Sequence, residues 1–252
     1  MADLVSVKWL ANNLDKSNIK LLDCTWRLLG ETTPLPEGNI AKSQYFDIDD
    51  IADKTSDMTH MLPSSDVFAK AVSLMDIDNE DHVICYDRHG IFSSPRVWWS
   101  FKAFGHKNVS VLDGGLPSWI KADLSITANY HVPQGETSFQ SKPPLLNVTN
   151  AEHVYNSIGT DIQIVDARPS GRFHGTTPEP RANLRSGRIP TSFSLPFGSL
   201  KQDDGTFLAL KDLASRVGAA GINLNKPIIT SCGSGVTAAG IAHVLYLSLI
   251  HI

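Results

Sequence analysis

The chain repeats one pattern of apolar strands and helices, and this repeat constrains its fold more than any other feature. An apolar run that ends in an acid, residues 19–23, returns at residues 162–166. A second run, residues 82–87, returns after nearly the same interval as residues 227–232. In both copies a glycine-containing loop and a helical pattern follow the second run. We therefore expect two tandem copies of one domain.

Short apolar β runs that alternate with helical patterns are typical of a mostly parallel sheet flanked by helices on both faces. The expected helices cover residues 95–104 and residues 236–247. With 42% hydrophobic residues, the chain has enough apolar material for two cores. We predict an α/β fold with a first domain at residues 1–135, a polar, proline-containing linker at 136–148 and a second domain at 149–252.

The two copies differ after their second helix. The first copy continues through a strand near residues 107–112 and a helix around Trp119, whereas the sequence ends at Ile252, soon after Cys232. The second domain is therefore expected to lack its last strand and helix, either as a property of the domain or because the sequence is truncated. Since the loss of a strand exposes an apolar sheet edge, we expect the chain to be destabilised.

Charge and cysteine content narrow the classes of function. A net charge of −4 gives no electrostatic basis for binding nucleic acid or an anionic membrane. Cys24, Cys85 and Cys232 lie far apart without a C-x-x-C pair, which argues against a disulfide framework or structural zinc and favours a reducing compartment. No stretch has the pattern of a transmembrane helix or a signal peptide, so the cytoplasm is the expected location.

The segment CGSGVTA at residues 232–238 carries the strongest chemical signal. Cys232 follows a buried strand, at the edge of an α/β sheet where ligands bind. Gly233 and Gly235 allow backbone amides to turn toward an anion, and the helix that follows adds positive partial charge, so the nucleophilic thiolate is favoured. A buried structural cysteine beside a tight turn is the alternative. Ala238 stands where a cysteine phosphatase needs its arginine, which disfavours that chemistry.

These residues resemble those of the two-domain sulfurtransferases of the rhodanese superfamily. The loop CGSGVT at residues 232–237 is similar to that of the 3-mercaptopyruvate sulfurtransferases. Supporting motifs are YFDID at 45–49, HMLP at 60–63, SPRVWW at 94–99, LDGG at 112–115, GRFHG at 171–175 and PEPR at 178–181. The resemblance implies two tandem rhodanese-like domains, with the catalytic cysteine in the second and an inactive first copy, in which Asp87 stands at the position of the nucleophile.

The activity that the resemblance implies is transfer of sulfur from 3-mercaptopyruvate through a persulfide on Cys232, with release of pyruvate. The implied acceptors are a small thiol, cyanide or a thioredoxin-like protein, and no metal or organic cofactor is expected. Thiosulfate:cyanide sulfurtransfer is the first alternative, although thiosulfate enzymes of the superfamily typically carry Arg-Lys where this chain has Gly233-Ser234. An inactive binding module is the second alternative. The family occurs in mitochondria as well as in the cytosol.

Two arginines are implied as substrate-binding residues. Arg172 and Arg181 are expected to hold the carboxylate and ketone of the donor, because the planar guanidinium matches a carboxylate in a bidentate way. From the residues alone, two solvated surface arginines are the alternative. The remaining expected substrate contacts come from the catalytic loop, at Gly233, Ser234, Gly235, Val236 and Thr237.

A Ser234–His60–Asp49 relay is also implied by the resemblance, with its last two members supplied by the first domain. Sequence spacing alone gives no contact among these three residues. Considered without the resemblance, His60 is a surface-loop histidine and Asp49 is a turn or capping residue.

Overall fold

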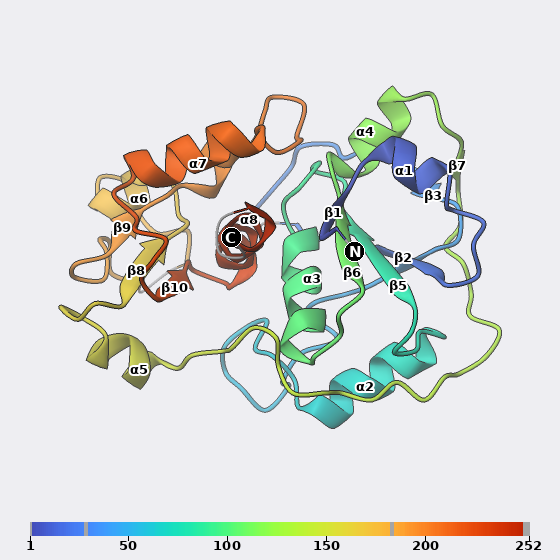
Figure 1. Ribbon diagram of the computed structural model, residues 1–252, viewed down its shortest axis with the longest axis horizontal. Helices are drawn as coiled ribbons and strands as arrows, with labels where there is room; N and C mark the ends of the chain where they lie inside the picture. Colours follow the sequence, from blue (N-terminus) through green and yellow to red (C-terminus); the bar gives the residue numbers. More distant parts are fainter. Residues whose placement is uncertain (1, 28–29, 182–183, 249–252) are drawn as a thin grey trace. The chain divides into compact units, whose positions relative to one another are not determined.

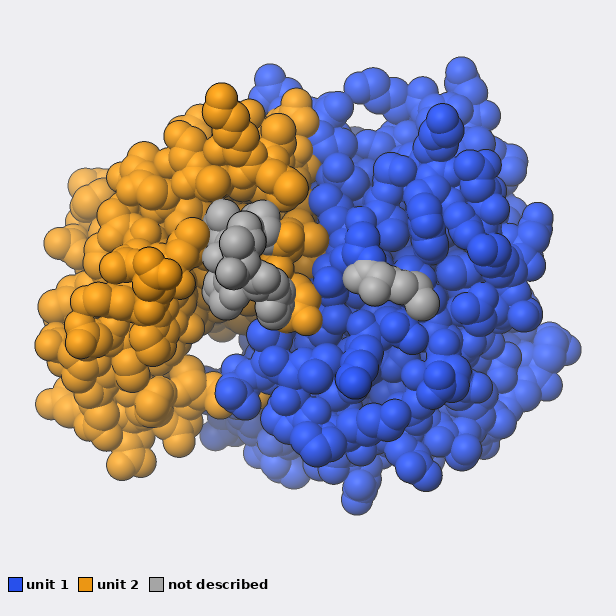
Figure 2. All heavy atoms as spheres, in the orientation of Figure 1, with its two compact units in different colours: residues 1–147, 203–206 blue, residues 148–202, 207–252 orange. Residues whose placement is uncertain are grey.

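The repeated strand pattern of the sequence becomes two separate parallel sheets, each in its own unit of the chain. The computed structural model describes residues 2–27, 30–181 and 184–248 (Figure 1). Unit 1 comprises Met1–Asn147 and Asp203–Thr206, and unit 2 comprises Val148–Gln202 and Phe207–Ile252 (Figure 2). Both units combine parallel strands with helices, which confirms the predicted α/β class.

Unit 1 contains a five-stranded sheet in the order β1-β6-β5-β2-β4, and all its strand pairs are parallel. Its strands are β1 (Leu4–Val5), β2 (Ile19–Asp23), β4 (Ser43–Tyr45), β5 (His82–Tyr86) and β6 (Val109–Leu112). A separate antiparallel pair joins β3 (Asn39–Ile40) and β7 (Ile126–Thr127). All five residues of β5 are buried, as expected for a central strand that is covered on both faces.

Helices cover both faces of this sheet (Figure 1). They are α1 (Val7–Ala11), α2 (Ser65–Leu74), α3 (Ser94–Ala103) and α4 (Gly115–Lys121). The α2 helix begins where the Ser64 side chain accepts a hydrogen bond from Val67 N. The α3 helix carries Pro95 in its first turn, where the missing N–H is not needed.

The two faces have different cores. On one face, Leu10 of α1 and Trp119 of α4 join Ile84 and Tyr86 of β5 in one apolar cluster. On the other face, aromatic rings of α2, α3 and the segments that follow them pack together; the ring of Phe68 stacks on a neighbouring phenylalanine with 4.2 Å between ring centroids. These cores hold the carboxyl end of β5, and therefore the loop after it, in a fixed position.

Unit 2 contains a three-stranded parallel sheet in the order β10-β8-β9. Its strands are β8 (Gln163–Asp166), β9 (Phe193–Ser194) and β10 (Ile228–Ser231). Its helices are α5 (Ala151–Asn156), α6 (Ser170–His174), α7 (Leu210–Ala219) and α8 (Val236–Ser248), with a short 3-10 helix, η1 (Phe197–Leu200). The predicted strand at residues 227–232 therefore ends at Ser231 and leaves Cys232 in the loop.

The strand registers show how the repeat is built. In unit 1, β2 pairs with β5 so that Asp23 lies opposite Tyr86. In unit 2, β8 pairs with β10 so that Asp166 lies opposite Ser231. Each acid therefore lies beside the last residue of the strand that carries the loop. Asp87 and Cys232 follow at equivalent places.

Among the described residues, no strand follows α8, and residues 249–252 of the tail lie outside the described part. The segment predicted as a linker, residues 136–148, has no helix or strand. Much of it packs on unit 1: Phe139 is buried, and Leu145 N donates to Lys102 O at 2.9 Å. The predicted domain limits stay predictions.

Candidate active site at Cys232

Cys232 is half-buried in the turn between β10 and α8. The backbone amide of Gly235 donates a hydrogen bond to Cys232 Sγ at 3.1 Å. Gly235 has a φ of 75°, a left-handed conformation that favours glycine, and this conformation turns its amide toward the sulfur. One of the amides expected to turn inward, that of Gly235, is therefore directed at the sulfur. An amide donor in this position stabilises negative charge on sulfur.

The other loop residues are placed by the start of α8. Ser234 is half-buried in the turn, and Val236, the first residue of α8, is 1% exposed. Thr237 is half-buried in the first turn of the helix. Because the Val236 side chain is packed inside the unit, only its backbone remains to contact a ligand.

Arg172, on α6, forms an ion pair with Glu179. Arg172 Nη2 donates to Glu179 Oε2 at 2.5 Å and Nε donates to the same oxygen at 3.1 Å. The side chain of Glu179 is only 4% exposed, and that of Arg172 is 21% exposed. The hydrogen bond from Arg172 is the largest cause that lowers the pKa of Glu179, so this carboxylate is ionised.

Both predicted substrate arginines lie close to Gly233, the residue that follows the cysteine. Arg181 Nη1 donates to the Gly233 carbonyl oxygen at 3.2 Å. A Cβ atom added to Gly233 would lie 3.1 Å from Arg172 Nη2, which is a tight contact. The alternative of a solvated surface arginine does not describe Arg172, although Arg181 is exposed. The structure thus brings these two cations together with the loop of Cys232.

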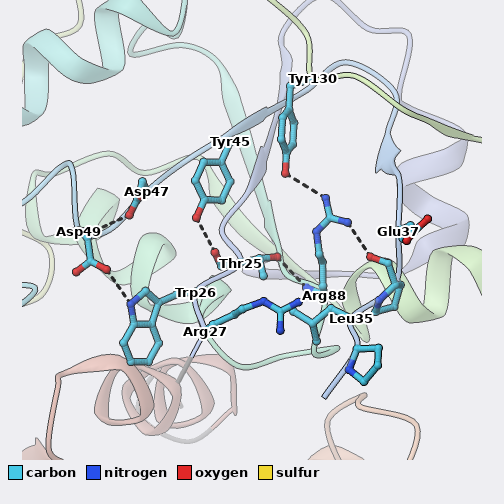
Figure 3. Close-up of a pocket in the computed structure, with 12 residues that line it drawn as sticks. Thr25, Trp26, Arg27, Leu35, Glu37, Tyr45, Asp47, Asp49, Arg88 and Tyr130 are labelled. Carbon is cyan, nitrogen blue, oxygen red and sulfur yellow. Dashed lines mark hydrogen bonds between the residues drawn. The ribbon is translucent and has the colours of Figure 1, made fainter. Parts of the chain in front are cut away.

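His60 and Asp49 form a pair within unit 1. His60 Nδ1 lies 2.5 Å from Asp49 Oδ1, and Trp26 Nε1 donates to Asp49 Oδ2 at 3.0 Å (Figure 3). Arg96 Nη2 donates to the His60 carbonyl oxygen at 2.5 Å and so holds the left-handed backbone of this residue, whose φ is 60°. His60 is buried rather than at the surface. Ser234 belongs to unit 2, and its part in a relay with this pair stays a prediction.

The corresponding loop of unit 1 encloses a carboxylate. Asp87 Oδ2 accepts hydrogen bonds from the amides of Phe92, Ser93 and Ser94 at 2.8, 3.0 and 2.9 Å. The Ser94 hydroxyl donates to the same oxygen at 2.7 Å. The side chain of Asp87 therefore occupies the anion position that the amides create. Unit 1 has this acid where unit 2 has Cys232.

Unit 1 also holds a pocket of about 740 Å³ that sequence reasoning misses (Figure 3). Asp49 and Trp26 line it together with Thr25, Arg27, Pro34, Leu35, Pro36, Glu37, Tyr45, Asp47, Arg88 and Tyr130. Arg88 pairs with the buried Asp23 at 2.9 Å and donates to the Tyr130 hydroxyl at 3.1 Å. Burial, with the charge of Asp23 as the next cause, raises the pKa of Tyr130 to about 12, so this phenol stays protonated.

Glu179, the buried ion-pair partner of Arg172, is a residue near the site that sequence reasoning misses. Its signal is an acid between the two prolines of the PEPR motif, shortly after Arg172. Within the described ranges, no cluster of three or more histidine, cysteine or acidic side chains is placed to bind a metal ion. No helix in those ranges is both long and apolar enough to cross a membrane.

Comparisons with known proteins identify the family of the chain. Residues 6–122 match the model of the rhodanese-like domain. The mitochondrial thiosulfate/3-mercaptopyruvate sulfurtransferase 1 of Arabidopsis thaliana is 39% identical over 264 residues, covering 95% of this chain and 70% of that protein. The 3-mercaptopyruvate sulfurtransferase of Homo sapiens is 35% identical over 254 residues, covering 97% of this chain and 86% of that protein.

A solved structure extends the likeness to the fold. The crystal structure of SseA from Escherichia coli, which has the rhodanese fold, superimposes with a TM-score of 0.86 at 32% sequence identity, covering 98% of this chain and 94% of that chain. The predicted two-domain rhodanese fold is thereby confirmed, as is the resemblance carried by the sequence motifs. This chain belongs to the family of thiosulfate/3-mercaptopyruvate sulfurtransferases, enzymes of the rhodanese fold that transfer sulfur.

Proposed function

We propose that this enzyme takes sulfur from 3-mercaptopyruvate and holds it as a persulfide on Cys232. One observation carries the proposal: the sulfur of Cys232 accepts an amide hydrogen bond, and the next residue, Gly233, is hydrogen-bonded by Arg181 and lies close to Nη2 of Arg172. A nucleophile and two cations that suit a keto acid therefore lie in one loop region. The name of the human relative supports the same donor.

The reaction proceeds in two displacement steps. The Cys232 thiolate attacks the sulfur of 3-mercaptopyruvate, the carbon–sulfur bond breaks, and its electron pair leaves with the carbon as pyruvate enolate. Protonation of the enolate gives pyruvate, and Cys232 retains the transferred sulfur. The acceptor thiolate then attacks the outer sulfur and regenerates the Cys232 thiolate. The amides of the loop, including that of Gly235, stabilise the anionic sulfur in both steps.

The other site residues have assigned roles in this proposal. Arg172 and Arg181 hold the carboxylate and ketone of the donor, since their guanidinium groups match an oxyanion in charge and shape. The hydroxyl of Ser234 donates a hydrogen bond to the enolate as it leaves. The relay role of His60 and Asp49 is supported by the family resemblance alone. Gly233, Val236 and Thr237 complete the loop around the bound donor.

Thiosulfate is the alternative donor, and the Arabidopsis relative is named for both compounds. The Gly233-Ser234 pair after the cysteine is neutral, which favours a monoanionic keto acid over a small dianion. Alanine at Arg172 or Arg181 should raise KM for 3-mercaptopyruvate more than for thiosulfate. Steady-state kinetics with each donor makes this comparison. An equal rise in KM for both donors would contradict the assignment of Arg172 and Arg181 to the keto acid.

The acceptor and the compartment are part of this proposal. A small thiol, a thioredoxin-like protein or cyanide takes the outer sulfur, because the second step needs only a nucleophile that attacks sulfur. Cys24 and Cys85 are buried and free, which suits a reducing compartment such as the cytoplasm or the mitochondrion. The Arabidopsis relative carries a mitochondrial designation. Turnover with reduced thioredoxin, compared with thioredoxin whose thiols are alkylated, tests the protein acceptor.

The direct kinetic test of the mechanism is Cys232→Ser. This variant should release no pyruvate above background, whereas Cys85→Ser, at a buried thiol of unit 1, should keep the activity of the native enzyme. Activity retained by Cys232→Ser would disprove the covalent mechanism. Complete inactivity of the native enzyme with both donors would instead favour an inactive binding module.

A further inference from the structure

Four charged side chains of unit 2 form an alternating chain that ends beside Cys232. Arg168 Nη2 donates to Asp166 Oδ2 at 2.6 Å, and Arg168 Nη1 donates to Glu179 Oε1 at 2.7 Å. Glu179 Oε2 then accepts from Arg172, whose Nη2 lies against Gly233. All four side chains are less than a quarter exposed. The two arginines and two acids have no net charge together. Each of the four ions is paired with at least one ion of opposite charge.

Glu179 occupies one defined edge of the Arg172 guanidinium. It accepts hydrogen bonds from Nε and from one hydrogen of Nη2. Among the described residues, none accepts a hydrogen bond from Nη1. The edge between Nη1 and Nη2 is therefore the one that can take a second carboxylate, in an end-on, bidentate arrangement.

Glu179 is itself held from the opposite side. Arg168 binds its other oxygen and also donates to the Gly187 carbonyl oxygen at 2.7 Å, so the carboxylate has little freedom to move. The lowered pKa of Glu179 agrees with this arrangement, because the carboxylate is stabilised chiefly by Arg172. An arginine on the five-residue helix α6 would otherwise sample many rotamers.

We infer that Glu179 is the positioning residue that fixes Arg172 for an end-on contact with the donor carboxylate and that sets the preference for a monoanionic donor. This inference rests on the proposed function. The positioning role follows from the two hydrogen bonds that Arg172 Nε and Nη2 donate to Glu179, because they fix the orientation of the guanidinium. Donor preference follows from charge: the carboxylate cancels one of the two cations near the loop, and a dianion loses more from that cancellation than a monoanion does.

Glu179→Gln tests both parts, because it keeps the shape of the side chain and removes the charge. The kcat/KM for 3-mercaptopyruvate should fall by about tenfold or more, mainly through KM, while that for thiosulfate should stay within about threefold of native or rise. The matched control is Asp161→Asn, which removes an exposed carboxylate paired with Lys226 in the same unit. That control should leave the ratio of the two donors unchanged.

The conservative variant and a double variant separate positioning from folding. Glu179→Asp keeps the charge and should retain more of the native donor ratio than Glu179→Gln does. In a background of Arg172→Ala, Glu179→Gln should cause no further loss with 3-mercaptopyruvate, since Glu179 acts through Arg172. Losses that multiply in the double variant would overturn the inference. So would an unchanged donor ratio, or an equal fall with both donors accompanied by a lower Tm.

Failure of this inference and failure of the proposed function give different results. If the proposed function is wrong, the native enzyme itself will release no pyruvate from 3-mercaptopyruvate. If only the inference is wrong, the native enzyme will turn over normally and Glu179→Gln will keep the native donor ratio.

Discussion

Gly233 follows Cys232 in the chain, and its missing side chain leaves room for the nearby Arg172 guanidinium. Arg181 reaches its carbonyl oxygen, and Arg172 lies where a Cβ atom would press on Nη2 at 3.1 Å. Gly235 has a different role, because its left-handed φ of 75° directs its amide to Cys232. One glycine provides space beside an arginine, and the other provides a backbone conformation.

Alanine at these two positions should therefore have separable effects. Gly233→Ala should raise KM for 3-mercaptopyruvate several-fold with little change in Tm, because the methyl group presses on Nη2 and moves the Arg172 guanidinium out of the orientation that Glu179 gives it. Gly235→Ala should lower the free energy of unfolding by about 1 kcal/mol, since a Cβ is strained at positive φ. Kinetics and thermal unfolding of both variants check this. Loss of Tm in Gly233→Ala with an unchanged KM would contradict the role given to Gly233.

At the scale of elements, the loop between β5 and α3 shows how unit 1 satisfies its backbone amides. Asp87 is fully buried, and one of its oxygens accepts three amides and a hydroxyl. Its other oxygen accepts the His89 amide at 2.9 Å. The carboxylate thus supplies the acceptors for backbone groups that would be unsatisfied at the start of α3.

Asp87→Asn should destabilise unit 1, because an amide side chain presents one acceptor where the carboxylate presents two. The expected loss is about 2 kcal/mol or more in the free energy of unfolding, measured by urea denaturation. Pyruvate release at temperatures where the variant stays folded should be unchanged, because the nucleophile lies in unit 2. If the variant is as stable as the native enzyme, the amides around Asp87 do not need a charged acceptor.

At the scale of the whole molecule, two buried histidines make stability depend on pH. His82 and His106 are 2% and 1% exposed, and burial lowers the pKa of each to about 4. Between the ordinary pKa of about 6.5 and about 4, the unfolded chain binds protons that the folded chain does not. The free energy of unfolding should therefore fall as the pH decreases through this window.

Urea denaturation at a series of pH values measures this dependence. In His106→Asn the slope of the unfolding free energy between pH about 6.5 and about 4 should be smaller than in the native protein, because one fewer group takes up a proton on unfolding. An identical slope in the variant would show that His106 is not responsible.

The sequence predicts the strands at β2, β5, β8 and β10 and the position of Cys232 in the loop after β10, because apolar periodicity and glycine spacing act locally. The role of Cys232 as nucleophile stays a prediction. The sequence also predicts that Arg172 and Arg181 bind the substrate, but this prediction comes from the family resemblance and not from residue spacing. It does not predict the ion pair of Glu179, the capture of the loop amides by Asp87 or the contact of Trp26 with Asp49. These contacts depend on where side chains point once the sheets have formed. The spacing of hydrophobic residues along the sequence carries no information about them.

The central claim is that Cys232 carries the transferred sulfur. Mass spectrometry of the enzyme after one turnover with 3-mercaptopyruvate, without an acceptor, tests it most directly. The account predicts that the peptide containing Cys232 gains one sulfur atom and that one pyruvate is released per active site. Pyruvate release with no sulfur on that peptide, or with the sulfur on Cys24 or Cys85, would contradict it.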